Sequence, residues 1–85
     1  MKKLKYVVAK SGSFDQPFIF SDLIVHREFA QMAGFKPEQI VGAGFVQVDF
    51  QNQKFFPYGD SVSLKIGTTP EAIAAFEQMF NGYGF

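Results

Sequence analysis

The chain contains no cysteine and no tryptophan, and His26 is its single histidine. Disulfides and cysteine-based zinc sites, which stabilise many small domains, are therefore excluded. Its 8 Lys and Arg balance its 8 Asp and Glu, so it lacks the net positive charge that attracts a protein to nucleic acid. No apolar run approaches the roughly 20 residues that a membrane span requires. We therefore expect a cytoplasmic protein without a membrane partner and without a cofactor, and the balanced charge disfavours a nucleic-acid partner.

Aromatic residues are the feature that the chain has in excess. It contains 12 Phe and 3 Tyr among 85 residues. A single domain of this length has room for about eight or nine large side chains in its core, so some of these rings must lie outside it. Exposed apolar patches usually mark interaction sites. We expect the interaction surface to include Phe45, Phe55, Phe56, Tyr58, Tyr83 and Phe85.

The first third of the chain predicts two strands and a helix. Apolar and polar residues alternate over 3–10, and the lysines of this segment favour an edge strand. A second strand over 14–20 contains Pro17, which fits an edge or the start of a strand. A helical period follows from about Val25 and ends at Gly34, with a buried stripe of Phe29, Met32 and Ala33.

The remainder predicts three strands and a second helix. The longest β-type segment covers 40–51, where Gly42 and Gly44 indicate a bulge or a close approach by another part of the chain. Its hairpin partner is 54–58, and a clean alternation over 62–66 predicts a further strand. A threonine followed by Pro70 then predicts the start of a helix that runs to about Phe80.

These elements predict one α+β domain over residues 1–85, with a flexible tail at 81–85. Their order, ββαβββα, favours an antiparallel sheet of about five strands with both helices on one face. On that face we expect Val46, Val48, Val62, Leu64 and Ile66, in contact with Phe29, Ile73 and Phe76.

Catalytic and metal chemistry have little support. His26 has no traceable nucleophile or orienting group, so we interpret it as structural. Together with Asp22 and Glu28 it matches no recognised zinc spacing. The segment 58–61 has the ordinary composition of a tight turn. We therefore predict no catalytic, cofactor-binding or metal-binding residue, and no enzymatic activity.

One alternative to protein binding remains open. Lys54 lies among Phe55, Phe56 and Tyr58, and a sheet that carries aromatic rings and lysines can stack the bases of single-stranded nucleic acid. The zero net charge makes this the lesser hypothesis.

Three segments of the chain resemble a group of short uncharacterised proteins from bacteriophages and prophages. These segments are FIFSDLIVHREFA (18–30), IVGAGFVQVD (40–49) and YGDSVSLKIGTTPEA (58–72). The resemblance implies a phage setting in a bacterial host and an α+β fold, and it implies no activity or site.

The sequence thus predicts a small non-catalytic module that binds another protein or itself as a homo-oligomer. A phage accessory or host-modulating factor would fit this description. A single-stranded nucleic-acid-binding protein and a virion structural component are the alternatives.

Overall fold

The computed structural model describes residues 2–81, the last two by their backbone alone. Two helices and antiparallel strands make an α+β fold, which confirms the predicted class. The elements are β1 (Lys2–Ser11), β2 (Phe14–Phe20), α1 (His26–Met32), the 3₁₀ turn η1 (Pro37–Gln39), β3 (Ile40–Asp49), β4 (Lys54–Tyr58), β5 (Asp60–Ser61), β6 (Ile66–Gly67) and α2 (Pro70–Asn81).

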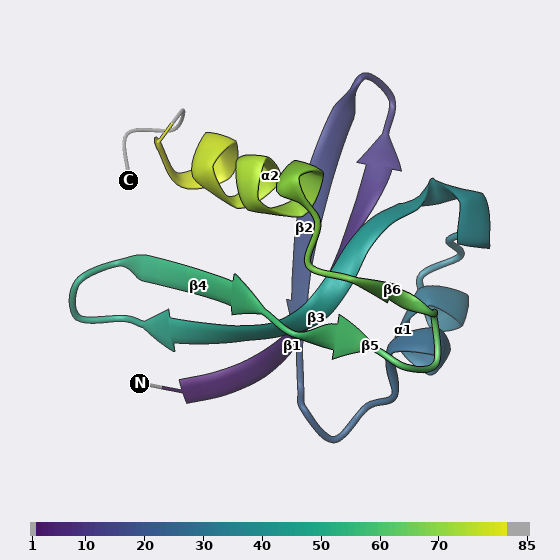
Figure 1. Ribbon diagram of the computed structural model, residues 1–85, viewed down its shortest axis with the longest axis horizontal. Helices are drawn as coiled ribbons and strands as arrows, with labels where there is room; N and C mark the ends of the chain where they lie inside the picture. The colour runs from purple at the N-terminus through teal and green to yellow at the C-terminus, as the bar shows by residue number, and fades with distance from the viewer. Residues whose placement is uncertain (1, 82–85) are drawn as a thin grey trace.

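Four strands form the main sheet in the order β2-β1-β3-β4, while β5 and β6 form a separate two-stranded ribbon (Figure 1). The prediction that β1 is an edge strand is wrong, because both β2 and β3 pair with it. Its run Tyr6–Ala9 is fully buried, as a central strand requires. The lysines that suggested an edge occupy the first half of β1, where the sheet is less covered.

Each true edge of the sheet carries a proline within its strand. Pro17 of β2 lies opposite Val8, and Pro57 of β4 lies opposite Val46. Proline is tolerated in an edge strand because its missing N–H then faces solvent. Each edge therefore lacks a donor where an added strand would need one, which opposes association by strand pairing.

The two helices lie on opposite faces of the sheet, so the prediction that they share one face is wrong. One core joins α2 to the face that contains Tyr6 and Val8, and the other joins α1 to the face that contains Val7 and Ala9. Because β1 is apolar at both even and odd positions, each face needs its own cover. In Figure 1, α2 lies across β2, and α1 lies beside the turn between β5 and β6.

This division corrects several predicted contacts. Val46, Val48 and Phe76 do pack together, as predicted. Phe29, in contrast, stacks on Phe20 in the α1 core. Ile73 of α2 is exposed, as are Met32 at the end of α1 and the C-cap residue Ala33.

Most of the predicted strand over 62–66 is a turn instead, and only its last residue, Ile66, belongs to a strand, where it begins β6. Its alternation reflects a loop in which Val62 is 90% exposed, whereas Leu64 and Ile66 pack against the α1 core. The buried Ser61 hydroxyl accepts a hydrogen bond from the Leu64 amide at 3.1 Å, and Lys65 has a positive φ of 56°. A left-handed residue of this kind cannot continue a strand.

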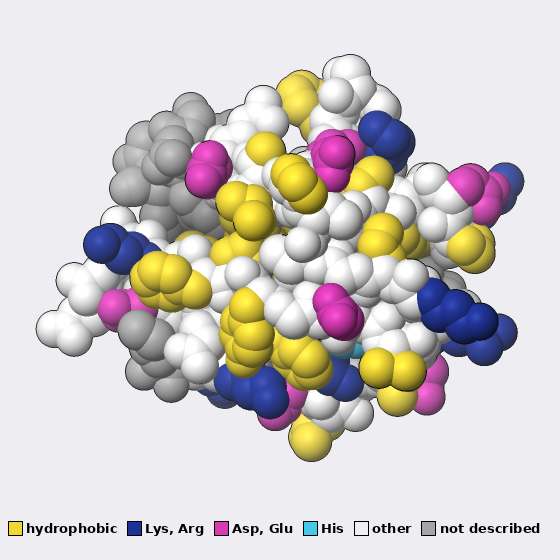
Figure 2. All heavy atoms as spheres, in the orientation of Figure 1, with side chains coloured by type: hydrophobic (Ala, Val, Ile, Leu, Met, Phe, Trp, Pro, Cys, Tyr) yellow, Lys and Arg dark blue, Asp and Glu magenta, His cyan; other side chains and the backbone are white. Residues whose placement is uncertain are grey.

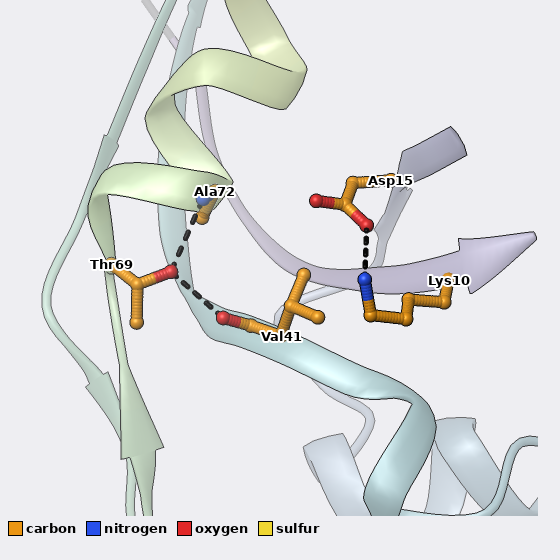
Figure 3. Close-up of polar contacts among 5 residues, drawn as sticks. All are labelled: Lys10, Asp15, Val41, Thr69 and Ala72. Carbon is orange, nitrogen blue, oxygen red and sulfur yellow. Dashed lines mark hydrogen bonds and ion pairs between the residues drawn. The ribbon is translucent and has the colours of Figure 1, made fainter. Parts of the chain in front are cut away.

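The predicted start of α2 is confirmed. Thr69 Oγ1 accepts a hydrogen bond from the Ala72 amide at 3.1 Å and donates one to the Val41 carbonyl at 2.7 Å (Figure 3). One hydroxyl thus caps the helix and ties it to β3. Near the C-terminal end of β1, Lys10 forms an ion pair with Asp15 at 3.4 Å across the β1–β2 hairpin (Figure 3).

Candidate functional site

Half of the sheet face on the α1 side is not covered by α1. The register places Phe45 between Lys5 and Tyr58, and it places Gln47 between Lys3 and Phe56. The hairpin formed by β3 and β4 extends away from α1 (Figure 1), which leaves these side chains open on that side. We call this surface the aromatic face; it comprises Lys3, Lys5, Phe45, Gln47, Asp49, Lys54, Phe56 and Tyr58.

Aromatic contacts organise the centre of this face. The ring of Phe45 stacks on Tyr58 with centroids 5.9 Å apart, and the ammonium of Lys3 lies 4.6 Å from the Phe45 centroid. Phe56 remains 45% exposed and Tyr58 38% exposed. Figure 2 shows hydrophobic side chains over β4 and near the point where β4 leads into β5, with Lys or Arg side chains beside them. The face thus offers two partly exposed rings beside cationic groups.

The structure brings together three of the residues predicted for the interaction surface, namely Phe45, Phe56 and Tyr58. Phe55 points to the opposite face, where it stacks on Phe76 with centroids 6.3 Å apart and packs against the α2 core. The predicted tail residues Tyr83 and Phe85 lie outside the described residues, and the helix α2 extends to Asn81.

Sequence reasoning missed Lys3 and Lys5 as members of this face. These residues lie about 40 positions from Phe45 and Gln47 in the chain, and only the pairing of β1 with β3 brings them together. The sequence did indicate that the two lysines share a face, because they alternate with Leu4 in one strand.

His26 is buried beneath the aromatic face and contacts Phe45. It is 4% exposed, and its ring lies edge-on to Phe20 and to Phe45, with centroids 5.5 and 5.8 Å away. Its Nε2–H donates to the Gly44 carbonyl at 2.7 Å, which ties α1 to β3. Burial lowers the pKa of His26, and the nearby charge of Lys5 adds to that shift, while the bond to Gly44 opposes it. The imidazole therefore holds Phe45 in place in its neutral form.

We expect stability to decrease as the pH falls below about 6.5, the ordinary pKa of histidine. The folded chain holds the His26 proton less tightly than the unfolded chain, so stability is retained above this pH and lost as the pH falls towards the lowered folded pKa. Urea unfolding at pH values of about 7.5 and 5.5, above most carboxylate titration, measures the loss.

His26→Gln is the matched variant, because it keeps an N–H donor for Gly44 and cannot titrate. Its stability should be flat between these pH values and within about 1–2 kcal/mol of the parent at neutral pH. An equal pH dependence in parent and variant would show that another group is responsible.

The turn over 58–61 has a structural explanation. The Ser61 side chain is buried and accepts from the Leu64 amide, with Ser63 Oγ at 3.5 Å. Ser63 Oγ in turn accepts from the Arg27 amide at 3.1 Å and links this turn to α1. These hydroxyls are therefore occupied in holding the β5–β6 ribbon against α1.

A hollow of about 500 Å³ lies between β2 and α2, away from the aromatic face. Its lining includes Phe14, Pro17 and Met79, and its one charged side chain, Asp15, is paired with Lys10. It offers no unpaired charge to orient a ligand, so the aromatic face is the stronger candidate.

Within residues 2–81, no three His, Asp or Glu side chains are grouped so that they could hold a metal ion. Across the same residues, no helix is long and apolar enough to cross a membrane. Comparisons with protein-family models, with curated proteins and with solved structures find no match. The functional proposal therefore depends on the sequence and the geometry of this chain.

Proposed function

We propose that this protein is a small non-catalytic binding module and that the aromatic face is its contact surface. The observation that carries the proposal is the partial exposure of Phe56 and Tyr58 on paired strands of the main sheet. Rings held on a sheet offer contact area at little cost in conformational entropy. Tyr is also enriched among the residues that dominate binding energies at protein interfaces.

A protein partner fits this surface better than a substrate does. The buried polar side chains that could serve catalysis, His26 and Ser61, both take part in structural hydrogen bonds. The partner is a different protein or a second copy of this chain, and the sequence resemblance supports a phage accessory or host-modulating role. A virion component is a further form of the same proposal.

Single-stranded nucleic acid is the second candidate. The specific observation in its favour is that Lys3 and Lys54 share the aromatic face with the exposed rings. Aromatic residues flanked by lysines can stack bases while they neutralise phosphates. Salt-dependent binding of an oligonucleotide at low salt, abolished by loss of the rings, would favour this candidate.

Replacing Phe56 and Tyr58 together by serine should weaken partner binding by about 30-fold or more, the loss expected when hot-spot residues are removed. Because both side chains are partly exposed, the double variant should remain folded. The measurement is capture of a partner from cells of the native host, followed by titration of the purified partner with parent and variant.

Phe14→Ser is the control, because Phe14 is 61% exposed and belongs to the hollow beside α2, not to the aromatic face. It should leave binding unchanged. Sedimentation of the parent at about 100 μM, a range in which weak dimers are populated, shows whether a second copy is the partner. Binding that depends on Phe14 and not on Phe56 and Tyr58 would move the site to the hollow and refute the proposal.

A further inference from the structure

We infer that the ligand of the aromatic face is an acidic protein segment in which carboxylates flank an aromatic or long aliphatic side chain. This inference rests on the proposed function and specifies the chemistry of the partner. It follows from the charges of the face, from the groups that already occupy them, and from the geometry of the rings.

The aromatic face carries an excess of positive charge although the whole chain is neutral. Its charged members are three lysines and Asp49. The Asp49 carboxylate accepts bonds from the Asn52 amide at 3.2 Å and from its side-chain nitrogen at 2.8 Å, which lower the pKa of Asp49 and hold it in the hairpin turn. The carboxylate therefore stabilises the turn, and within residues 2–81 it forms no ion pair with the lysines of the face.

Lys3 and Lys54 are the ammonium groups that remain for a ligand. The only ion pair among residues 2–81 joins Lys10 to Asp15, on the other hairpin. Lys5 is partly buried and donates to the Ile24 carbonyl at 2.9 Å. Both Lys3 and Lys54 are exposed; Lys3 lies in the row that contains Phe56, and Lys54 lies in the adjacent row. A ligand that binds on these rings gains the most binding free energy if it carries carboxylates that can pair with the two ammonium groups.

A second copy of the chain is a poor match for this charge. In a two-fold dimer the same patch meets itself, so the lysines of one copy would approach those of the other. Like charges at an interface reduce affinity and on-rate. Association at the sheet edges is opposed as well, because β2 and β4 contain Pro17 and Pro57. A complementary partner of opposite charge avoids both penalties.

Nucleic acid fits less well than an acidic segment. The Lys3 ammonium already covers the ring of Phe45, so the exposed stacking positions reduce to Phe56 and Tyr58, about 7 Å apart along β4. A single strand of several nucleotides needs a series of cations along its backbone. Two exposed ammonium groups on the same face as the Phe56 ring match two carboxylates better.

An NMR titration of the intact chain tests this inference with four probes. The first is a short peptide with one phenylalanine between two pairs of glutamates, and the second has lysines in place of the glutamates. The third keeps the glutamates and has serine in place of phenylalanine, and the fourth is an oligothymidylate of similar length. We expect the first to shift the amides of Lys3, Phe45, Phe56 and Tyr58, and to bind about tenfold more tightly than the second at low salt.

Charge reversal gives the decisive comparison. The double variant Lys3→Glu and Lys54→Glu should bind the lysine peptide about tenfold more tightly than the glutamate peptide. It should still bind the glutamate peptide that contains phenylalanine more tightly than the one that contains serine. Lys36→Glu is the control, because Lys36 is exposed and lies outside the aromatic face, and it should keep the parent preference.

Three outcomes would overturn the inference. If the glutamate and lysine peptides that contain phenylalanine bind equally well, the ligand has no preference for acidic segments and the inference is wrong. The proposed function is not affected by that result, because partner capture that depends on Phe56 and Tyr58 tests it separately. Tighter binding of oligothymidylate at the same amides would replace the protein partner by nucleic acid. The absence of shifts on the aromatic face with the first peptide at about 1 mM, enough to detect even weak binding, would overturn it as well.

Discussion

Gly44→Ala is expected to destabilise the protein by about 3 kcal/mol, the upper range for an added group in a packed interior. An ideal Cβ at this position would lie 2.5 Å from the Tyr58 carbonyl oxygen and 2.8 Å from the Gly59 carbonyl oxygen. The Gly59 oxygen cannot move away easily, because Thr68 donates to it from both its amide and its hydroxyl, each at 2.9 Å. The chain must therefore separate β3 from the segment that follows β4.

The cost should be visible in melting temperature and in function. For a domain of this size, about 3 kcal/mol lowers the melting temperature by roughly 12–24 °C. Gly44 also precedes Phe45 and accepts the bond from His26, so its displacement moves the centre of the aromatic face. A changed imidazole resonance of His26, which is unambiguous in a chain with one histidine, would report this movement.

Gly34→Ala is the matched control. Gly34 has a positive φ of 80°, but no atom lies within 4 Å of an added Cβ. Its cost is limited to backbone strain of about 1–2 kcal/mol. Equal losses for the two variants would show that the close approach at Gly44 does not constrain the fold.

The sequence predicted where the main-sheet strands and both helices lie, because their periodicity and end signals are local. The glycines at 42 and 44 were also interpreted correctly. Val41 is the extra residue where the pairing shifts from Val8 opposite Gly42 to Ala9 opposite Ile40, which is the predicted bulge. Gly42 meets Ala72 of α2 closely, as Gly44 meets the chain after β4.

The faces of the sheet could not be predicted in the same way. Tyr6 and Val8 predicted one buried face of β1, but Val7 and Ala9 were equally apolar, and the lysines earlier in the strand outweighed them in the interpretation as an edge. Which strands flank β1 depends on pairing over long distances in the chain, and periodicity within one strand carries no information about it.

The candidate site shows the same limit at the level of single residues. Phe55 and Phe56 are adjacent in one strand, so only one of them can share a face with Tyr58. The prediction included both rings, although alternation within β4 would have been enough to choose Phe56. Lys3 could be added only from the register, which pairs it with Gln47 and so with the row of Phe56.

Phe76→Ala is expected to cost about 3–5 kcal/mol, the usual loss when a buried phenylalanine is truncated. Phe76 is 3% exposed, and among the described side chains of α2, which end at Met79, it is the largest one in the core. Its ring lies edge-on to Tyr6 with centroids 5.1 Å apart and stacks on Phe55. Truncation removes the ring contacts of Phe76 with Tyr6 of β1 and Phe55 of β4 at once and leaves a cavity.

The control for this truncation is Phe50→Ala. Phe50 is 68% exposed in the turn between β3 and β4, so its loss should change stability by no more than about 0.5 kcal/mol. Urea unfolding of both variants measures the difference, and comparable costs would mean that α2 is not packed on the Tyr6 face.

Phe76→Leu separates stability from binding. It keeps most of the buried volume and should cost less than the alanine variant, about 1–2 kcal/mol. Because Phe76 lies on the opposite side of the sheet from Phe56 and Tyr58, a folded leucine variant should bind the partner as the parent does. A loss of binding in this folded variant would place part of the contact surface on the α2 side and contradict the assignment of binding to the aromatic face alone.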